Sequence, residues 1–110
     1  MCDLQAKAKT LRNLVFSSAP DGDEEIYIMD AEGSRLQQLT DSPPGVTNRT
    51  PEWSHESRYI AFQSNRDGTR DLYRLDIQSK DIRRLTHTQN GSANHPAWSS
   101  CGQYLAFTSD

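Results

Sequence analysis

The sequence repeats itself with a period of about 45 residues. Residues 51–54 (Pro-Glu-Trp-Ser) return as residues 96–99 (Pro-Ala-Trp-Ser), which places the two tryptophans 45 residues apart. An apolar segment that ends at Phe62 returns 45 residues later at Phe107, and an earlier copy ends at Phe16, 46 residues upstream. A period of this length is typical of a stacked array of one supersecondary unit. The repeat therefore constrains the architecture more than the function.

Each repeat is expected to form four short strands. The segments are rich in Ile, Val, Tyr and Phe and are bounded by Gly, Pro, Asn, Asp or Ser. Asp-Gly pairs at 21–22 and 67–68 predict tight hairpins, because glycine accepts positive φ at no steric cost. Successive hairpins give a four-stranded antiparallel meander. The predicted strands are 51–54 and 96–99; 14–16, 59–62 and 104–107; 25–30 and 71–76; and 35–40 and 81–86.

The segment 25–30 carries apolar groups on both faces of its predicted strand. Side chains alternate along a strand, so Ile26 and Ile28 point one way while Tyr27 and Met29 point the other. Such a sheet lies between two neighbours, as the blades of a β-propeller do. The predicted fold class is all-β, with about two and a half propeller blades in an incomplete ring. Its parts are an N-terminal tail or degenerate first strand (1–11) and a repeat region (12–110) with a partial blade (12–40), a full blade (51–86) and a half blade (94–110).

Aromatic residues recur at equivalent positions of the copies. Because such rings bury a large area that every blade needs, we expect them to pack in the interior rather than to stack on a ligand. The residues are Trp53, Trp98, Phe16, Phe62, Phe107, Tyr27 and Tyr73.

Composition excludes several classes of function. The net charge is −3 and the lysines and arginines are scattered, so the sequence predicts no nucleic-acid partner. No apolar stretch is long enough to insert into a membrane, and the N-terminus lacks the apolar region of a signal peptide. Cys2 and Cys101 have no metal-binding spacing and are expected to be free thiols.

No catalytic, cofactor or metal residues are predicted. His55, His87 and His95 lack ligand spacing, and the sequence contains no Gly-x-Ser-x-Gly nucleophile turn. Residues 21–25 (Asp-Gly-Asp-Glu-Glu) resemble a calcium loop, but in the next copy, 67–71, two of the acids are Thr and Arg. The segment is therefore interpreted as a solvated hairpin tip.

Polar residues that precede the Pro-x-Trp motif are the candidates for binding a partner. They are Asn48-Arg49-Thr50 and, 45 residues later, Ala93-Asn94-His95. The first strand of a blade lines the central channel, so these residues are expected at the channel mouth. They differ between copies, unlike the packing residues. Arg49, Asn94 and His95 are the predicted partner-binding residues, and an ordinary polar loop is the alternative.

The motifs resemble the TolB-like propeller repeat over about residues 12–110. The matching segments are 51–54, 60–62 (Ile-Ala-Phe), 64–68 (Ser-Asn-Arg-Asp-Gly), 72–76 and Leu85-Thr86. The Pro-Asp-Gly turn of the family is replaced by His55-Glu56-Ser57 and by Ser100-Cys101-Gly102.

The resemblance implies a non-enzymatic module that binds proteins or acts as a scaffold, periplasmic if it is a fragment of an exported protein. The alternative is the non-catalytic gating propeller of a tricorn- or prolyl-oligopeptidase-type peptidase. A remnant without a function of its own is a third possibility.

The copies start and stop out of step with whole blades, and two explanations follow. The favoured expectation is a fragment of a longer propeller. The other is self-association of copies into a ring, in which the 96–99 strand of one chain supplies the missing first strand of the next chain.

Overall fold

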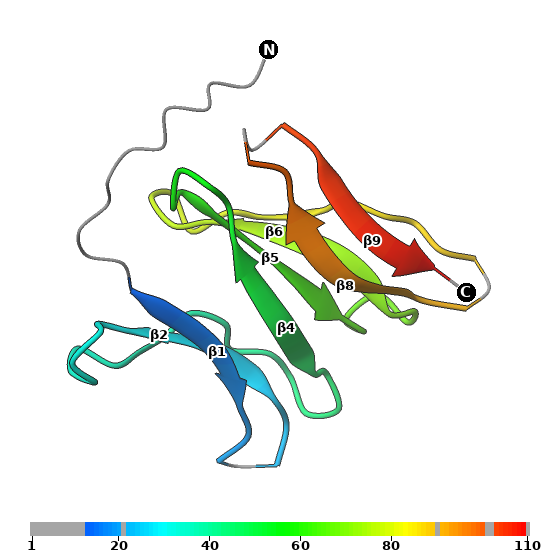
Figure 1. Ribbon diagram of the computed structural model, residues 1–110. Coiled ribbons are helices and arrows are strands. Elements are labelled where there is room, and N and C mark those ends of the chain that lie inside the picture. Colours follow the sequence, from blue (N-terminus) through cyan, green and yellow to red (C-terminus); the bar gives the residue numbers. More distant parts are fainter. Residues whose placement is uncertain (1–12, 21, 90, 101–102, 110) are drawn as a thin grey trace.

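The computed structural model describes residues 13–20, 22–89, 91–100 and 103–109, and it places nine strands in three antiparallel sheets within them (Figure 1). Cys2, Cys101 and Asp21 lie outside the described residues. The first sheet holds β1 (Leu14–Ser18), β2 (Glu25–Met29) and β3 (Gln37–Gln38). The second holds β4 (Asn48–Trp53), β5 (Tyr59–Ser64), β6 (Asp71–Asp76) and β7 (Ile82–Arg84). The third holds β8 (Ala93–Trp98) and β9 (Leu105–Ser109).

Strand order within each sheet follows the sequence, so every sheet is a meander. The complete sheet runs β4-β5-β6-β7, while the flanking sheets run β1-β2-β3 and β8-β9. In Figure 1 the strand β4 lies between β1 and β8, and it contacts both of them. The expected all-β partial propeller is therefore confirmed. We call the three sheets the first, second and third blades.

Glycine makes the hairpin turns as expected. Gly68 has a φ of 102° and its N–H donates to the carbonyl of Asn65 at 3.0 Å. Gly22 has a φ of 110°, and its N–H reaches the carbonyl of Ala19 at 3.3 Å. Both values lie in the region that disfavours residues with a Cβ, so these turns depend on glycine.

The innermost strands are longer than predicted and each carries a bulge. β4 and β8 begin three residues before their prolines, and their registers shift between Arg49 and Glu52 and between Asn94 and Ala97. Because proline has no N–H to donate, the ladder is interrupted next to it. The equivalent residues Thr50 and His95 adopt positive φ values of 51° and 55°. The fourth strands are shorter than predicted, at two and three residues.

The core lies where the first two blades face each other. Ile26 of the first blade packs with Phe62, Tyr73 and other residues of the second, and none of these is more than 2% exposed. Burying an aliphatic or phenyl side chain of this size contributes about 1.5–3 kcal/mol. One face of β2 is covered by the second blade, and Ile26 and Ile28 are buried there. On the other face Tyr27 is half-buried and stacks on Phe16 of its own sheet, with ring centroids 5.8 Å apart. Among the described residues, therefore, one of the two expected neighbours is present.

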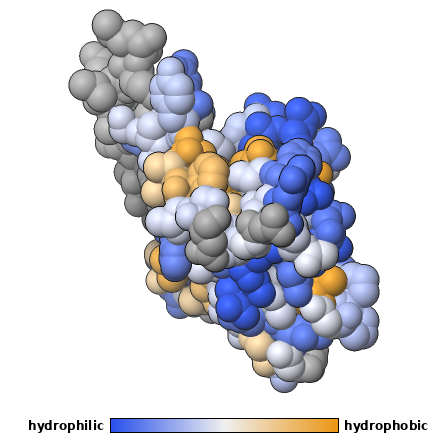
Figure 2. Space-filling model, turned by 90° about the vertical axis from the view of Figure 1, so that its right-hand side faces the viewer, coloured by the Kyte–Doolittle hydropathy of each residue, from blue (hydrophilic) through white to orange (hydrophobic). Residues whose placement is uncertain are grey.

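The third blade departs from the packing expectation. Phe107 occupies the position equivalent to Phe62, yet Phe107 is 45% exposed whereas Phe62 is fully buried. Phe62 stacks on Tyr73 of the next strand, and among the described residues β9 has no such strand beside it. The prediction that Phe107 packs in the interior is therefore wrong for this structure. Figure 2 faces this end of the molecule and shows apolar atoms exposed among polar ones.

Candidate functional site

Two inner strands begin side by side at one end of the blades, and a backbone hydrogen bond holds each in place. The N–H of Asn48 donates to the carbonyl of Glu24 at 2.8 Å, and the N–H of Ala93 donates to the carbonyl of Arg70 at 2.9 Å. Glu24 and Arg70 each immediately precede the third strand of their blade. We call these contacts the first junction (Glu24, Glu25 and Asn48) and the second junction (Arg70, Asp71 and Ala93).

The first junction contains a buried carboxylate that links two blades. Glu25 accepts hydrogen bonds from the Thr40 hydroxyl at 2.5 Å, the Ser42 N–H at 2.8 Å and the Asn48 amide at 2.8 Å. The side-chain amide oxygen of Asn48 in turn accepts from the Arg66 guanidinium at 2.9 Å. The interpretation of Glu25 as part of a solvated hairpin tip is therefore wrong. Residues of the connection and of β4 cover this carboxylate and satisfy it.

Arg66 belongs to the Ser-Asn-Arg-Asp-Gly turn and lies against the aromatic core. Its guanidinium carbon lies 5.5 Å from the ring centre of Phe62 and 5.0 Å from that of Tyr73. Burial lowers the pKa of Arg66, and the charge of the guanidinium is stabilised by ring faces and by the Asn48 and Ser64 oxygens. This arginine therefore stabilises the junction.

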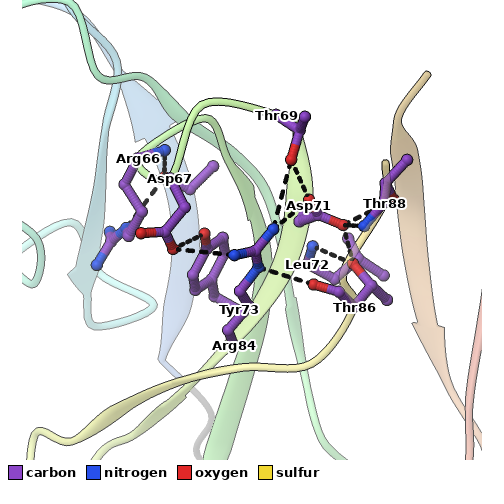
Figure 3. A network of polar contacts seen from close by, with 10 residues as sticks. Arg66, Asp67, Thr69, Asp71, Leu72, Tyr73, Arg84, Thr86 and Thr88 are labelled. Atoms are coloured by element: carbon purple, nitrogen blue, oxygen red, sulfur yellow. Dashed lines mark hydrogen bonds and ion pairs between the residues drawn. The ribbon is translucent and has the colours of Figure 1, made fainter. Parts of the chain in front are cut away.

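The second junction holds an equivalent carboxylate that is satisfied within its own blade (Figure 3). Asp71 is fully buried and accepts from the hydroxyls of Thr69 at 2.6 Å, Thr86 at 2.5 Å and Thr88 at 2.7 Å. The N–H of Thr88 and the guanidinium of Arg84 also donate to it, both at 3.0 Å. All of these donors belong to the second blade or to the connection that follows β7. Ala93, which replaces Asn48 here, has no polar side chain to contribute.

The electrostatics of this network stabilise the charged form of Asp71. Burial alone raises the pKa of its carboxyl, but the hydrogen bonds from Thr69, Thr86 and Thr88 outweigh burial and hold the pKa well below its ordinary value. Burial and a hydrogen bond to Asp67 raise the pKa of the Tyr73 hydroxyl beside it. A carboxylate whose acceptor sites are filled in this way supports the fold and is not poised to take a proton from a substrate.

The three residues predicted to bind a partner lie at the bulged ends of β4 and β8. Arg49 is half-buried and pairs with Glu24 at 2.8 Å. Asn94 accepts from the Gln63 amide at 2.6 Å and donates to the Ser92 hydroxyl at 2.8 Å. His95 is exposed on the bulge itself. These three residues therefore lie on two strands that contact each other.

Sequence reasoning did not find Glu24 and Arg70, which lie beside these residues. They are 46 residues apart and hold the same place in their repeats, so the repeat offset would have paired them. Both nitrogens at the end of the Arg70 guanidinium lie 3.4 Å from the Thr47 hydroxyl. Within the described part of the chain, Arg70 has no carboxylate within 4.0 Å. We call Arg49, Arg70, Asn94 and His95 the mouth surface.

A search for metal ligands gives a negative result for the residues that the structure describes. Among them, no three His, Cys, Asp or Glu side chains come together in a way that could hold an ion. The same residues include no helix with the length and hydropathy needed to cross a membrane.

Comparison with known proteins places this geometry in a family. The chain is similar to a TolB structure from Agrobacterium tumefaciens, with a TM-score of 0.80 and 24% identity over 89% of this chain and 34% of that one. It is also similar to TolB from Acinetobacter baumannii, with a TM-score of 0.71 and 25% identity over 87% of this chain and 23% of that one. The chain thus spans a minor part of either protein. A search of the curated proteins found no match. A model of the TolB beta propeller domain matches residues 10–110, and the chain therefore belongs to the TolB beta propeller domain family.

Proposed function

We propose that this chain is a non-enzymatic protein-binding module that presents its mouth surface to a protein partner. The observation that carries the proposal is a contrast between two sets of residues. Phe62 is buried in the core, and the carboxylates at the equivalent positions 25 and 71 are buried and accept hydrogen bonds from their own surroundings. At the mouth surface the equivalent positions carry different side chains, and those of Arg49 and His95 reach solvent.

The chemistry of the polar groups favours binding over catalysis. Glu25 and Asp71 are buried carboxylates with several donors each, so both are committed to the fold. The mouth surface instead offers guanidinium, amide and imidazole groups beside a bulged backbone, which suits recognition of a polar peptide or protein surface. Membership of the TolB beta propeller family supports the proposal by analogy of fold, and the mouth surface is the part of this chain from which the binding role is argued.

The strand order disfavours a ring built from several copies of this chain. β1 and β9 are both the second strand of their blade. β1 pairs with the third strand of the first blade, β2, and β9 pairs with the first strand of the third blade, β8. β8 of one chain would complete the first blade of another only if β9 were displaced, because β9 would otherwise occupy the position of β1. The order of the strands therefore favours a partner other than a second copy.

Site-specific crosslinking tests the proposal. A photoreactive residue at position 95 should capture a partner, whereas the same residue at position 37, on the outer edge strand β3, should not. The affinity of the identified and purified partner is then measured for the chain and for the double variant Arg49→Ala/His95→Ala. We expect about tenfold weaker binding, because each change removes a polar contact with the partner.

The control separates binding from folding. The double variant should unfold within about 0.5 kcal/mol of the unchanged chain, since the Arg49–Glu24 pair is partly exposed and such pairs contribute little to stability. Trp53→Ala serves as the destabilised reference, because Trp53 packs against the core. If the double variant loses as much stability as Trp53→Ala, then Arg49 and His95 are structural and the proposal is wrong.

A further inference from the structure

The two junctions carry opposite charges at one pair of equivalent positions. At the first junction Glu24 precedes the third strand and Arg49 follows the start of the next inner strand, and the two meet at 2.8 Å. At the second junction these two places are held by Arg70 and Asn94. A cation has therefore replaced the acid, while the residue opposite it is an uncharged amide. At this pair of positions the second junction therefore has a cation and no carboxylate.

Arg70 is a cation that its surroundings neutralise poorly. The Thr47 hydroxyl is its side-chain hydrogen-bond partner in the described structure, at 3.4 Å, which is long for a hydrogen bond. Burial lowers the pKa of Arg70, and the nearby charge of Arg49 lowers it further, while Glu24 opposes both effects. Glu24 is paired with Arg49 at 2.8 Å, so Arg70 has no carboxylate of its own among the described residues.

Arg49 adds a second unfilled donor. Its Nε atom is buried and has no hydrogen-bond partner, while its side chain remains 42% exposed. A planar guanidinium presents its N–H groups as a rigid fork that matches a carboxylate. These two arginines lie near the starts of the inner strands β4 and β8. The net charge of the whole sequence is −3, so this positive charge is local.

We propose that Arg70, together with Arg49, binds a carboxylate of the partner, supplied by an acidic segment. This inference rests on the proposed protein-binding function and specifies its chemistry. The carboxylate takes the place that Glu24 holds at the first junction. It supplies the negative charge that Asn94 does not provide and accepts hydrogen bonds from both guanidinium groups.

A labelled acidic peptide provides a direct test. A fluorescein-labelled hexaglutamate peptide is titrated with the chain at low ionic strength, with hexaglutamine as the neutral comparison, and binding is followed by fluorescence anisotropy. Arg70→Gln should weaken hexaglutamate binding about tenfold, the effect of losing one charge-assisted hydrogen bond. Arg83→Gln is the matched control, because Arg83 is an exposed arginine on β7 that leaves the same net charge when replaced.

A second variant supplies the missing acid from within the chain. Asn94→Glu places a carboxylate opposite Arg70 and recreates the first junction with its charges exchanged. It should weaken hexaglutamate binding at least as much as Arg70→Gln, while thermal unfolding stays unchanged or shifts upward. Asn94→Gln has the length of the glutamate variant without its charge, so the difference in hexaglutamate affinity between Asn94→Glu and Asn94→Gln measures the effect of the added carboxylate alone, and we expect Asn94→Glu to bind more weakly.

Each result bears on the inference. Equal affinities for Arg70→Gln and Arg83→Gln would overturn it, since diffuse surface charge would then explain binding. Tighter binding of inorganic phosphate than of hexaglutamate would also overturn it, because the site would then be one for phosphate. If Arg70→Gln abolishes hexaglutamate binding but the crosslinked partner still binds Arg49→Ala/His95→Ala normally, the carboxylate site stands and the proposed function fails. If the double variant loses partner binding while Arg70→Gln binds hexaglutamate normally, the proposed function stands and the carboxylate site fails.

Discussion

The first and second junctions share a backbone plan and differ in how strongly side chains join the blades. At the first, the Glu25 carboxylate is bonded to Asn48 on the next blade, and Asn48 is bonded to Arg66. At the second, Asp71 has more donors, but none belongs to β8 or β9. Polar side chains thus tie the first two blades together, whereas they tie the second blade mainly to itself.

The third blade is held by a different set of contacts. The Gln63–Asn94 hydrogen bond of 2.6 Å and the stacking of Trp98 on Tyr59, with centroids 6.4 Å apart, join the second and third blades. The indole N–H of Trp98 also donates to the Glu52 carbonyl at 3.1 Å. These contacts are nearer the surface than the buried Glu25 network. A blade held in this way leaves polar groups at its edge free for recognition.

Replacing Asp71, the buried carboxylate with the most hydrogen-bond donors, should have the largest effect on stability. Asp71→Ala leaves the threonine hydroxyls and Arg84 without their shared acceptor in a buried place, so we expect a loss of about 3 kcal/mol in the free energy of unfolding. Chemical denaturation measures it. Because Asp71 is bonded within its blade, hydrogen exchange should rise across β5, β6 and β7. A rise confined to β8 and β9 would contradict the distinction between the junctions.

Low pH should lower the stability of the second blade, because it protonates Asp71. The pKa of Asp71 in the folded chain lies below its ordinary value of 3.8, so its contribution to stability is complete above that pH. The contribution is lost as the pH falls below 3.8 through the folded pKa. Asp71→Asn removes this contribution, and its stability should fall less steeply than that of the unchanged chain below about pH 4. Denaturation at several pH values, with the exposed Asp81→Asn as the control for charge, provides the measurement.

Removing the tie between the first two blades should have a smaller effect. Asn48→Ala makes the first junction like the second, and it leaves Glu25 and Arg66 each without one partner. We expect a loss of about 2 kcal/mol, typical of hydrogen bonds to charged groups. Hydrogen exchange should increase in β1 and β2 more than in β8 and β9. Unchanged protection of β1 and β2 would show that apolar packing alone joins these blades.

The smallest expected effect concerns the indole hydrogen bond between the second and third blades. Trp98→Phe keeps an aromatic ring against Tyr59 and removes the donor to the Glu52 carbonyl. A loss of about 1 kcal/mol is expected for one hydrogen bond of this kind. Thermal unfolding reports the change, and Trp53→Phe, which removes the equivalent indole donor to Asn13, is the comparison. If Trp98→Phe has no effect while Trp53→Phe does, the indole bond does not hold the third blade.

Much of the fold is predictable because it depends on local signals. The alternation of side chains along a strand and the Asp67-Gly68 turn depend on residues that are adjacent in the sequence, and the repeat indicates the order of the strands. The bulges are not predictable, since Thr50 and His95 adopt positive φ without the glycine that normally indicates it. The burial of Glu25 depends on Asn48, a contact between residues 23 positions apart. Such contacts leave no periodic signal in a single sequence.

One signal of the difference between the junctions is present in the sequence. Gly45 and Gly91 are 46 residues apart, whereas Asn48 and Ala93 are 45 apart. The connection into the third blade is therefore one residue shorter after its glycine. The small change in the repeat period marks the place where the two junctions diverge, although it does not reveal the contacts made there.

The backbone hydrogen bond that starts each inner strand has an evolutionary consequence. The N–H of residues 48 and 93 and the carbonyl of residues 24 and 70 form it without any side chain. Every residue type except proline can donate this bond, and every type can accept it. Mutation can therefore exchange acid, base and amide at the entrance of a blade while the strand stays in place. A propeller built from such units can acquire a new binding preference by drift at a few positions, with no new architecture required.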